Sequence, residues 1–179
     1  MSIKGRIKTI YYQKIKKYSK SDLRILHLRD VGAHIGSHCY FFSDFLETTE
    51  PYLITVGDNV TIASGVRFIT HDDSAEYYFP RGSLIVGRIN IGNNVFIGAE
   101  SIIMPGVSVA DNCVIGAGSV VTQSITKEGS VVAGVPAKII SNTEELYKKN
   151  KKLCLVTTDM SFEEKKAFIL DNEEKIKKV

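Results

Sequence analysis

The chain has 179 residues, of which 44% are hydrophobic, and its formal net charge is +3. This composition predicts one main domain with a packed core, and no apolar run approaches the ~20 residues of a membrane-spanning helix. The three widely spaced cysteines argue against a disulfide framework and favour a reducing cytoplasm. The basic residues concentrate in residues 1–20, and the rest of the chain is mildly acidic, which argues against nucleic-acid binding by its body.

Residues 3–18 are expected to form an amphipathic helix, because Ile3, Ile7 and Ile10 begin an apolar series at helical spacing. The surrounding segment 1–20 is rich in lysine and contains no acidic residue. We expect this helix to pack on the body or on a neighbouring subunit. The alternative is weak contact with an anionic membrane surface, which basic amphipathic helices favour.

Residues 91–126 read as consecutive frames of six residues. Every frame opens with isoleucine or valine, at Ile91, Ile97, Ile103, Val109, Ile115 and Val121. A fixed period of six is typical of a parallel β-helix, in which three short strands and three corners make one coil of about 18 residues. The remaining places hold small or polar residues that tolerate sharp corners.

Side chains alternate along a strand, so the first and fifth places of each frame should face inwards and the sixth outwards. The outward places hold Phe96, Ile102, Ser108, Val114, Val120 and Thr126. Several of these are too apolar for a wall that only meets water. They indicate either a loosely apolar surface or a wall that meets a partner subunit or a ligand.

Weaker coils precede this array. One is expected to begin near Val31, residues 44–52 break the period, and the pattern returns at Val56. Residues 74–90 then interrupt the repeat, directly after a corner that carries His71. Loops inserted into a repeat scaffold often carry function, so this junction is the candidate site.

After Thr126 the period decays, and residues 134–138 are expected to form a terminating turn. Residues 143–152 and 162–177 are expected to be helices, and Ser161 with Glu164 has the spacing of a capping box. The predicted organisation is therefore a mainly β chain in three parts. These are an N-terminal helical segment (1–30), a β-helix (31–140) with its loop insertion (74–90), and C-terminal helices (141–179).

The hexapeptide array, the Thr-His pair before the inserted loop, and the phrases IGNNVFIG, IGAGSVVT and AGVPAK together resemble the hexapeptide-repeat acyltransferases. The pattern is most similar to the branch of maltose and galactoside O-acetyltransferases and their capsule- and sugar-modifying relatives. The resemblance covers residues 31–140. It implies a left-handed parallel β-helix, a homotrimer, and acetyl-CoA bound as acyl donor between neighbouring prisms, with no metal.

Through this resemblance, His71 matches the catalytic histidine, which removes a proton from the acceptor hydroxyl or amine. Asp72 or Asp73 is expected to orient the ring, and the amide of Gly98 or Ala99 to stabilise the oxyanion. Gln123 stands where sugar acetyltransferases often carry lysine. The residues that match the acetyl-CoA site are Phe96, Gly98, Ala99, Ala117, Thr122, Gln123 and Lys138.

The inserted loop offers Tyr77, Tyr78 and Arg81 as candidates for contact with the acceptor. Aromatic rings there could stack on a sugar, or they could equally pack the loop down. The expected function is cytoplasmic transfer of an acetyl group to a hydroxyl of a sugar or polysaccharide precursor.

Four alternatives stay open at this point. The first two are N-acetylation of an amino sugar and O-acetylation of serine. A third is a catalytically inactive β-helix scaffold, since fold does not give function. The fourth is a metal hydratase similar to γ-class carbonic anhydrase, with His34, His38 and His71 as zinc ligands, although the histidines occur in a different order from that family's.

Overall fold

The structure is a computed structural model that describes residues 18–43 and 49–177. It divides into two compact units, Met1–Thr143 and Glu144–Val179. The predicted amphipathic helix of residues 3–18, with its expected membrane contact, lies outside the described residues except at its last position. Within the described residues, none of the helices is both long enough and apolar enough to cross a bilayer.

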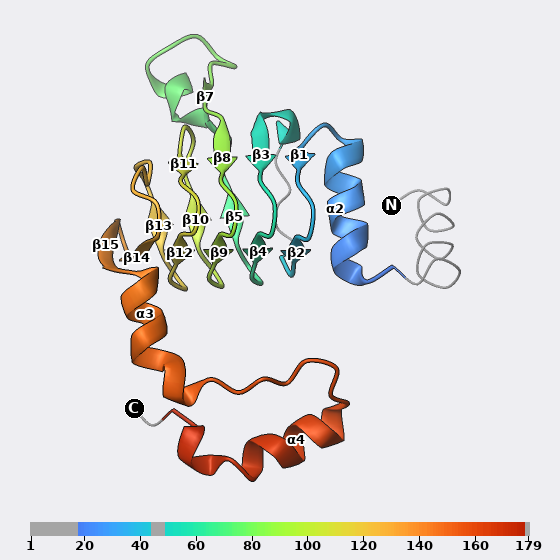
Figure 1. The fold of residues 1–179 in the computed structure, drawn as a ribbon. Coiled ribbons are helices and arrows are strands. Elements are labelled where there is room, and N and C mark those ends of the chain that lie inside the picture. The colour runs from blue at the N-terminus through green and yellow to red at the C-terminus, as the bar shows by residue number, and fades with distance from the viewer. Residues whose placement is uncertain (1–17, 44–48, 178–179) are drawn as a thin grey trace. The chain divides into compact units, whose positions relative to one another are not determined.

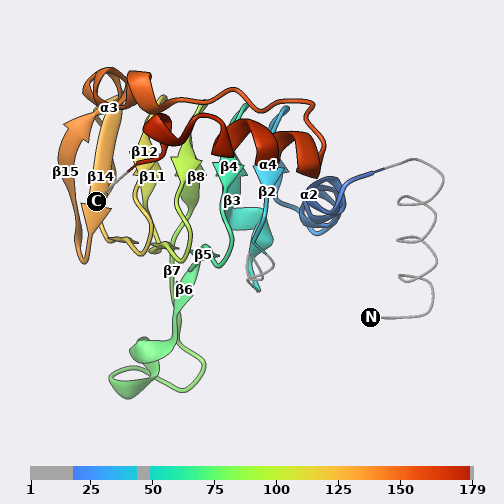
Figure 2. The same cartoon turned by 90° about the horizontal axis from the view of Figure 1, so that it is seen from below.

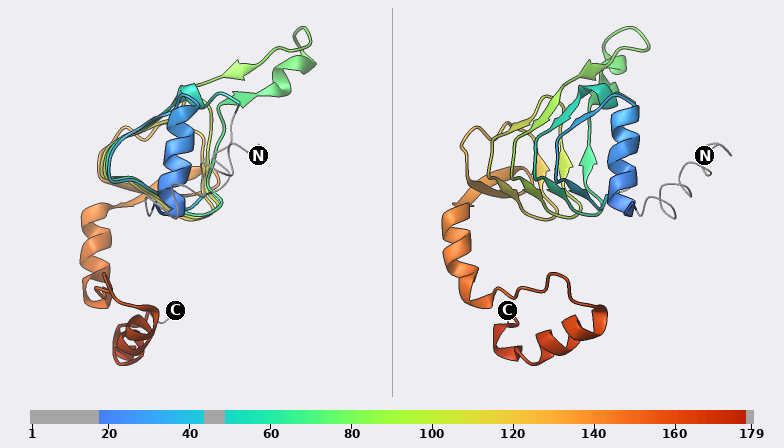
Figure 3. Two further views of the ribbon diagram at one scale, coloured as in Figure 1. Left: turned by 90° about the vertical axis from the view of Figure 1, so that its right-hand side faces the viewer. Right: turned by 45° about the vertical axis from the view of Figure 1, so that its right-hand side comes forward.

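Short parallel strands stack into the three walls of a prism (Figure 1; seen along its axis in Figure 3, left). The first wall consists of β1 (His34–Ile35), β3 (Ile54–Val56), β8 (Ile89–Ile91) and β11 (Ser108–Val109). The second consists of β2 (Tyr40–Phe41), β4 (Thr61–Ile62), β9 (Phe96–Ile97), β12 (Val114–Ile115), β14 (Ser130–Gly134) and β15 (Ala137–Asn142). The third consists of β5 (Arg67–Phe68), β10 (Ile102–Ile103) and β13 (Val120–Val121).

The six-residue period accounts for the core of this prism. Every predicted inward place between residues 91 and 125 is buried, and Ile97, Ile103 and Ile115 are completely inaccessible. Two inward places hold serines, Ser101 and Ser119, and both hydroxyls donate to the carbonyl of Gly116, at 3.0 Å and 2.6 Å. Their burial therefore leaves no hydroxyl without a partner.

The three walls differ in chemistry, as the strand registers show. The first, the polar wall, presents His34, Thr55, Asn90 and Ser108 outwards. The second, the aromatic wall, presents Tyr40, Thr61, Phe96 and Val114, with Phe96 44% exposed. The third, the aliphatic wall, presents Arg67, Ile102 and Val120. Two of the three walls thus expose apolar side chains in this single chain.

One corner of the prism is held by a ladder of asparagine side chains. Asn59, Asn94 and Asn112 all have positive φ, between 54° and 59°, which asparagine tolerates better than most residues. The amide of Asn59 donates to the Oδ1 atom of Asn94 at 2.8 Å, and that of Asn94 to the Oδ1 atom of Asn112 at 3.0 Å. The same side chains therefore permit the turn and tie successive coils together.

Helix α2 (Lys20–Asp30) covers the open edge of the first coil (Figure 1). The Ser21 hydroxyl accepts from the backbone N–H of Phe41 at 2.7 Å. The Arg29 guanidinium donates to the carbonyls of Ile35 and Gly36. These bonds satisfy edge groups that would otherwise be open to pairing with another chain.

At the predicted interruption an arm projects from one corner of the prism (Figures 2 and 3), and the chain rejoins the first wall at β8. The arm consists of β6 (His71–Asp72), η2 (Asp73–Tyr77) and β7 (Ile85–Val86), with β6 and β7 antiparallel. The short η1 (Pro51–Leu53) precedes β3 in the coil before.

The antiparallel pair β14 and β15 ends the prism, with its turn at the position where the sequence predicts one. After its first residue, α3 (Thr143–Asn150) belongs to the second unit, which also contains η3 (Lys151–Leu153), α4 (Phe162–Leu170) and η4 (Glu173–Lys175). Ser161 forms the predicted capping box with Glu164 at the start of α4. The helix ends earlier than predicted, because the chain after Leu170 turns and continues as η4.

Candidate active site

His71 lies where the chain leaves the aliphatic wall and enters the projecting arm. It follows Thr70, which is completely buried, and its own side chain is 28% exposed. The ring is therefore held at the prism edge rather than inside the coil, as its place in the repeat predicts.

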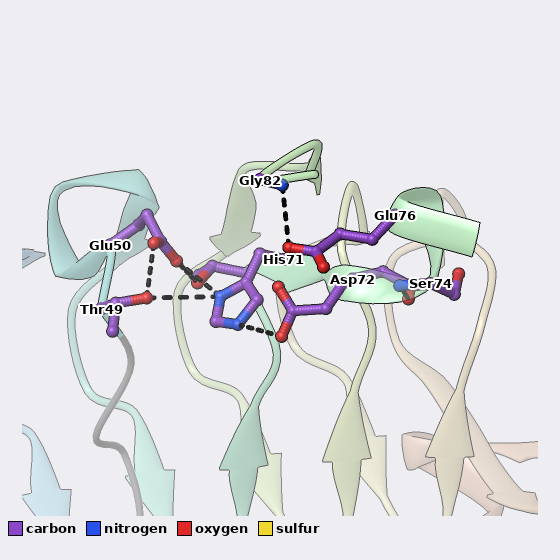
Figure 4. Close-up of polar contacts among 9 residues, drawn as sticks. Thr49, Glu50, His71, Asp72, Ser74, Glu76 and Gly82 are labelled. Atoms are coloured by element: carbon purple, nitrogen blue, oxygen red, sulfur yellow. Dashed lines mark hydrogen bonds and ion pairs between the residues drawn. The ribbon is translucent and has the colours of Figure 1, made fainter. Parts of the chain in front are cut away.

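Glu50, from the preceding coil, contacts the His71 ring directly (Figure 4). Its Oε2 atom lies 2.8 Å from Nδ1 of His71, and its side chain is only 12% exposed. The hydroxyl of Thr70 donates to the same Oε2 atom at 2.8 Å, and the hydroxyl of Thr49 donates to Oε1. Both oxygens of this carboxylate are thus engaged by neighbours.

These contacts keep Glu50 ionised. The hydrogen bond from Thr49 is the largest cause of a lowered pKa, and the bonds from Thr70 and His71 act in the same direction. They outweigh partial burial, which opposes ionisation, and hold the pKa of Glu50 at about 2. A carboxylate beside Nδ1 can only accept a hydrogen bond at neutral pH.

The two aspartates that follow His71 are placed differently. The Oδ1 atom of Asp72 accepts from the backbone N–H of Ser74 at 2.8 Å, and this bond lowers the pKa of Asp72. The Oδ2 atom of Asp73 lies 3.8 Å from Nε2 of His71, too far for a hydrogen bond. Neither aspartate bonds to the ring, and the carboxylate that does is Glu50, which the sequence reasoning did not identify.

The other candidate residues of the arm are exposed. The rings of Tyr77 and Tyr78 and the side chain of Arg81 stand clear of the prism in this single chain. The carboxylate of Glu76 accepts from the backbone N–H of Gly82 at 2.9 Å and so closes the tip of the arm (Figure 4). The rings of Tyr77 and Tyr78 are thus not packed down by the residues that the structure describes.

The residues matched to the acetyl-CoA site fall in three places. Thr122 and Gln123 follow β13 and lie at the same prism edge as His71, two coils further on. Lys138 lies in β15 at the end of the prism. The aromatic wall and the edge that follows it hold Phe96, Gly98, Ala99 and Ala117.

The two candidate oxyanion donors are not equivalent. The backbone N–H of Gly98 donates to the carbonyl of Ile115 at 2.8 Å, within the ladder between coils. It is therefore not available to a ligand, and the expectation for the amide of Gly98 is corrected. The N–H of Ala99 has no acceptor among the described residues, so Ala99 is the donor of this pair that a ligand could reach.

His71 and Ala99 lie on opposite sides of the aliphatic wall. About five residues of extended chain span that wall, which at ~3.3 Å each places the two edges roughly 15 Å apart. A general base must lie within hydrogen-bond reach of the proton that it removes. One chain therefore cannot bring His71 and Ala99 to the same thioester.

The described residues contain no group of three histidine, cysteine, aspartate or glutamate side chains arranged to hold a metal ion. His34 faces outwards from the polar wall, and His38 lies at a corner with φ 55°. The zinc hydratase interpretation therefore has no support from the geometry.

Comparisons with known proteins agree with this architecture. Residues 88–123 match the family model described as hexapeptide repeat of succinyl-transferase. The chain is 40% identical over 159 residues to Protein CapG of Staphylococcus aureus, covering 87% of this chain and 92% of that protein.

Two solved structures are similar along most of the chain. A galactoside acetyltransferase in complex with coenzyme A is 28% identical with a TM-score of 0.54, over 82% of each chain. A hexapeptide-repeat acetyltransferase from Vibrio cholerae O1 biovar eltor, in complex with acetyl-CoA, is 26% identical with a TM-score of 0.57. That match covers 78% of this chain and 84% of the other.

The chain belongs to the family of hexapeptide-repeat acetyltransferases. It is an acyltransferase, and the two solved neighbours hold coenzyme A and acetyl-CoA.

Proposed function

We propose that this protein transfers the acetyl group of acetyl-CoA to a hydroxyl of a sugar or polysaccharide precursor, with His71 as the general base. The observation that carries the proposal is the His71 ring, fixed at the prism edge at the root of an arm with exposed aromatic rings. Similarity to a galactoside acetyltransferase and to CapG supports a sugar-like acceptor.

The proposed assembly is a homotrimer of left-handed β-helices. Two walls of the chain expose apolar side chains, which a neighbouring subunit would cover. The distance between the His71 edge and the Ala99 edge supports a site shared between subunits. His71 would come from one subunit, and Phe96, Ala99 and Ala117 from the next.

The chemistry is one acyl transfer. A ring nitrogen of His71 removes the proton of the acceptor hydroxyl as its oxygen attacks the thioester carbonyl carbon. The carbonyl oxygen becomes an oxyanion, to which the Ala99 N–H donates. When the carbon–sulfur bond breaks, the departing thiolate of CoA takes the proton from the imidazolium, which leaves an acetyl ester and free CoA.

The donor would lie along the aromatic wall. Phe96 is exposed beside the expected path of the pantetheine arm, and Ala117 lies at the following edge. The Lys138 ammonium is exposed at the end of the prism, where it can meet a phosphate of CoA as a point charge. Tyr77, Tyr78 and Arg81 would contact the acceptor from the arm.

One observation favours a second acceptor class. The carboxylate of Asp73 lies 3.8 Å from Nε2 of His71 and would attract the ammonium of an amino sugar. N-acetylation of an amino sugar is therefore the alternative to O-acetylation.

The test is release of free thiol from acetyl-CoA across a panel of neutral sugars, amino sugars and serine, with wild type and His71→Ala. We expect thiol release with a sugar and a loss of about 10²–10⁴-fold in kcat for the variant. Full activity of the variant would remove His71 from the mechanism. Turnover with serine alone, or with none of these acceptors, would reject the proposed substrate class.

A further inference from the structure

We propose that Glu50 is a positioning residue that holds the proton of His71 on Nδ1, so that Nε2 is the atom that accepts the proton of the acceptor. This inference rests on the proposed role of His71 as general base. It adds a residue from the preceding coil and assigns a role to each ring nitrogen.

The assignment follows from counting protons around Nδ1. The Oε2 atom of Glu50, 2.8 Å away, has no proton of its own because the carboxylate is ionised. The hydroxyl oxygen of Thr49 lies 3.4 Å from Nδ1, and its proton goes to Glu50. Among the residues that the structure describes, each hydrogen-bond neighbour of Nδ1 thus acts as an acceptor, so a neutral imidazole carries its proton there.

The second nitrogen is left as the base. Nε2 has no hydrogen-bond partner among the described residues, since Asp73 Oδ2 is 3.8 Å away. With the proton on Nδ1, Nε2 carries the lone pair that proton abstraction needs. The side chain is exposed enough for an acceptor hydroxyl to approach this atom.

Glu50 is itself held in place. Thr70, completely buried, donates to Oε2, and Thr49 donates to Oε1, so the carboxylate has little freedom to turn away. When Nε2 takes up a proton, the ring becomes an imidazolium with this fixed negative charge beside Nδ1. A carboxylate in this position fixes the tautomer and stabilises the charged ring, as in Ser-His-Asp triads.

The kinetic test compares three variants with wild type in the thiol-release assay. Glu50→Gln should lower kcat by roughly 10²-fold, a loss comparable to that of a general base. The KM for acetyl-CoA should change little, because Glu50 bonds to Thr49, Thr70 and His71 and is not on the wall proposed to bind the donor. Asp72→Asn should have a much smaller effect, since Asp72 bonds to Ser74. Glu163→Gln, the same chemical change on exposed α4, is the matched control and should behave as wild type.

The second readout does not depend on any substrate. In ¹⁵N NMR of the full-length protein, the side-chain resonances of His71, assigned by their loss in His71→Ala, should show Nδ1 protonated and Nε2 bare at neutral pH. In Glu50→Ala this tautomer preference should disappear. Urea unfolding of each variant identifies one that has merely lost its fold.

Wild-type His71 protonated on Nε2, or a folded Glu50→Gln variant with wild-type kcat, would overturn the inference. If no tested acceptor is acetylated, the proposed function fails, while the NMR comparison still decides the role of Glu50.

Discussion

Phe96 and Ile97 are adjacent in β9 but should respond in opposite ways to truncation. Ile97 faces inwards and is completely buried, so Ile97→Ala should lower the free energy of unfolding by about 2–5 kcal/mol. Phe96 faces outwards and is 44% exposed. Fully burying such a side chain contributes about 1.5–3 kcal/mol, and Phe96 is only about half buried, so Phe96→Ala should lower the free energy of unfolding by about 1 kcal/mol.

The functional consequences should be reversed. Phe96→Ala removes the proposed contact with the pantetheine arm and should raise the KM for acetyl-CoA, whereas Ile97→Ala should leave that KM close to wild type while the protein is folded. Urea unfolding and thiol-release kinetics measure the two effects on the same preparations. If Phe96→Ala is as destabilising as Ile97→Ala and leaves the KM unchanged, the proposed role of the aromatic wall in donor binding is wrong.

Two further predictions concern the edge helix and pH. Arg29→Ala removes the guanidinium bonds to the open edge of the first coil and should lower the free energy of unfolding by about 1–2 kcal/mol. Arg29→Lys should recover only part of this stability, because an ammonium lacks the planar fork of a guanidinium. An Arg29→Ala variant that unfolds in urea like wild type would contradict this role. Because its native pKa is lowered from 4.5 to about 2, Glu50 stabilises the fold above pH 4.5 and loses this effect as pH falls towards 2. The melting temperature of wild type should exceed that of Glu50→Gln at pH 6, and this difference in melting temperature should decrease between pH 5 and pH 3. A difference that stays constant with pH would show that the charge of Glu50 is not what stabilises the fold.

Much of the prism could be predicted from residues 91–126, because a repeat states its structural rule several times. Each inward place falls in the core, and the polar exceptions, Ser101 and Ser119, are small enough to bond to a nearby carbonyl. The cap formed by α2 could not be predicted this way. Its key contacts run from Arg29 to backbone carbonyls, and backbone groups leave no pattern in a sequence.

The position of His71 at a corner before an interruption of the repeat identifies it as a candidate from the sequence alone. Nothing comparable identifies its partner Glu50. Asp72 is next to His71 in sequence, but consecutive residues of a strand point to opposite faces. Glu50 lies in the stretch that breaks the period, where no frame indicates which way a side chain points. The stacking of coils was nevertheless a usable signal. Because β3 pairs with β8 in the next coil, the residues just before β3, including Glu50, lie beside the base of the arm, where His71 is found.

The central claim of the proposed trimer is that His71 of one subunit meets a thioester held by its neighbour, and assemblies mixed from two variants test it most directly. The two parent variants are His71→Ala and Ala117→Trp. Ala117 is exposed, so the larger ring should obstruct the edge proposed to bind the donor without disturbing the core. Each parent should be inactive alone. Co-expressed in equal amounts, they should regain about one quarter of wild-type activity, because a site is intact only when its histidine comes from one variant and its wall from the other. Mixed trimers that remain as inactive as the parents would contradict a shared site.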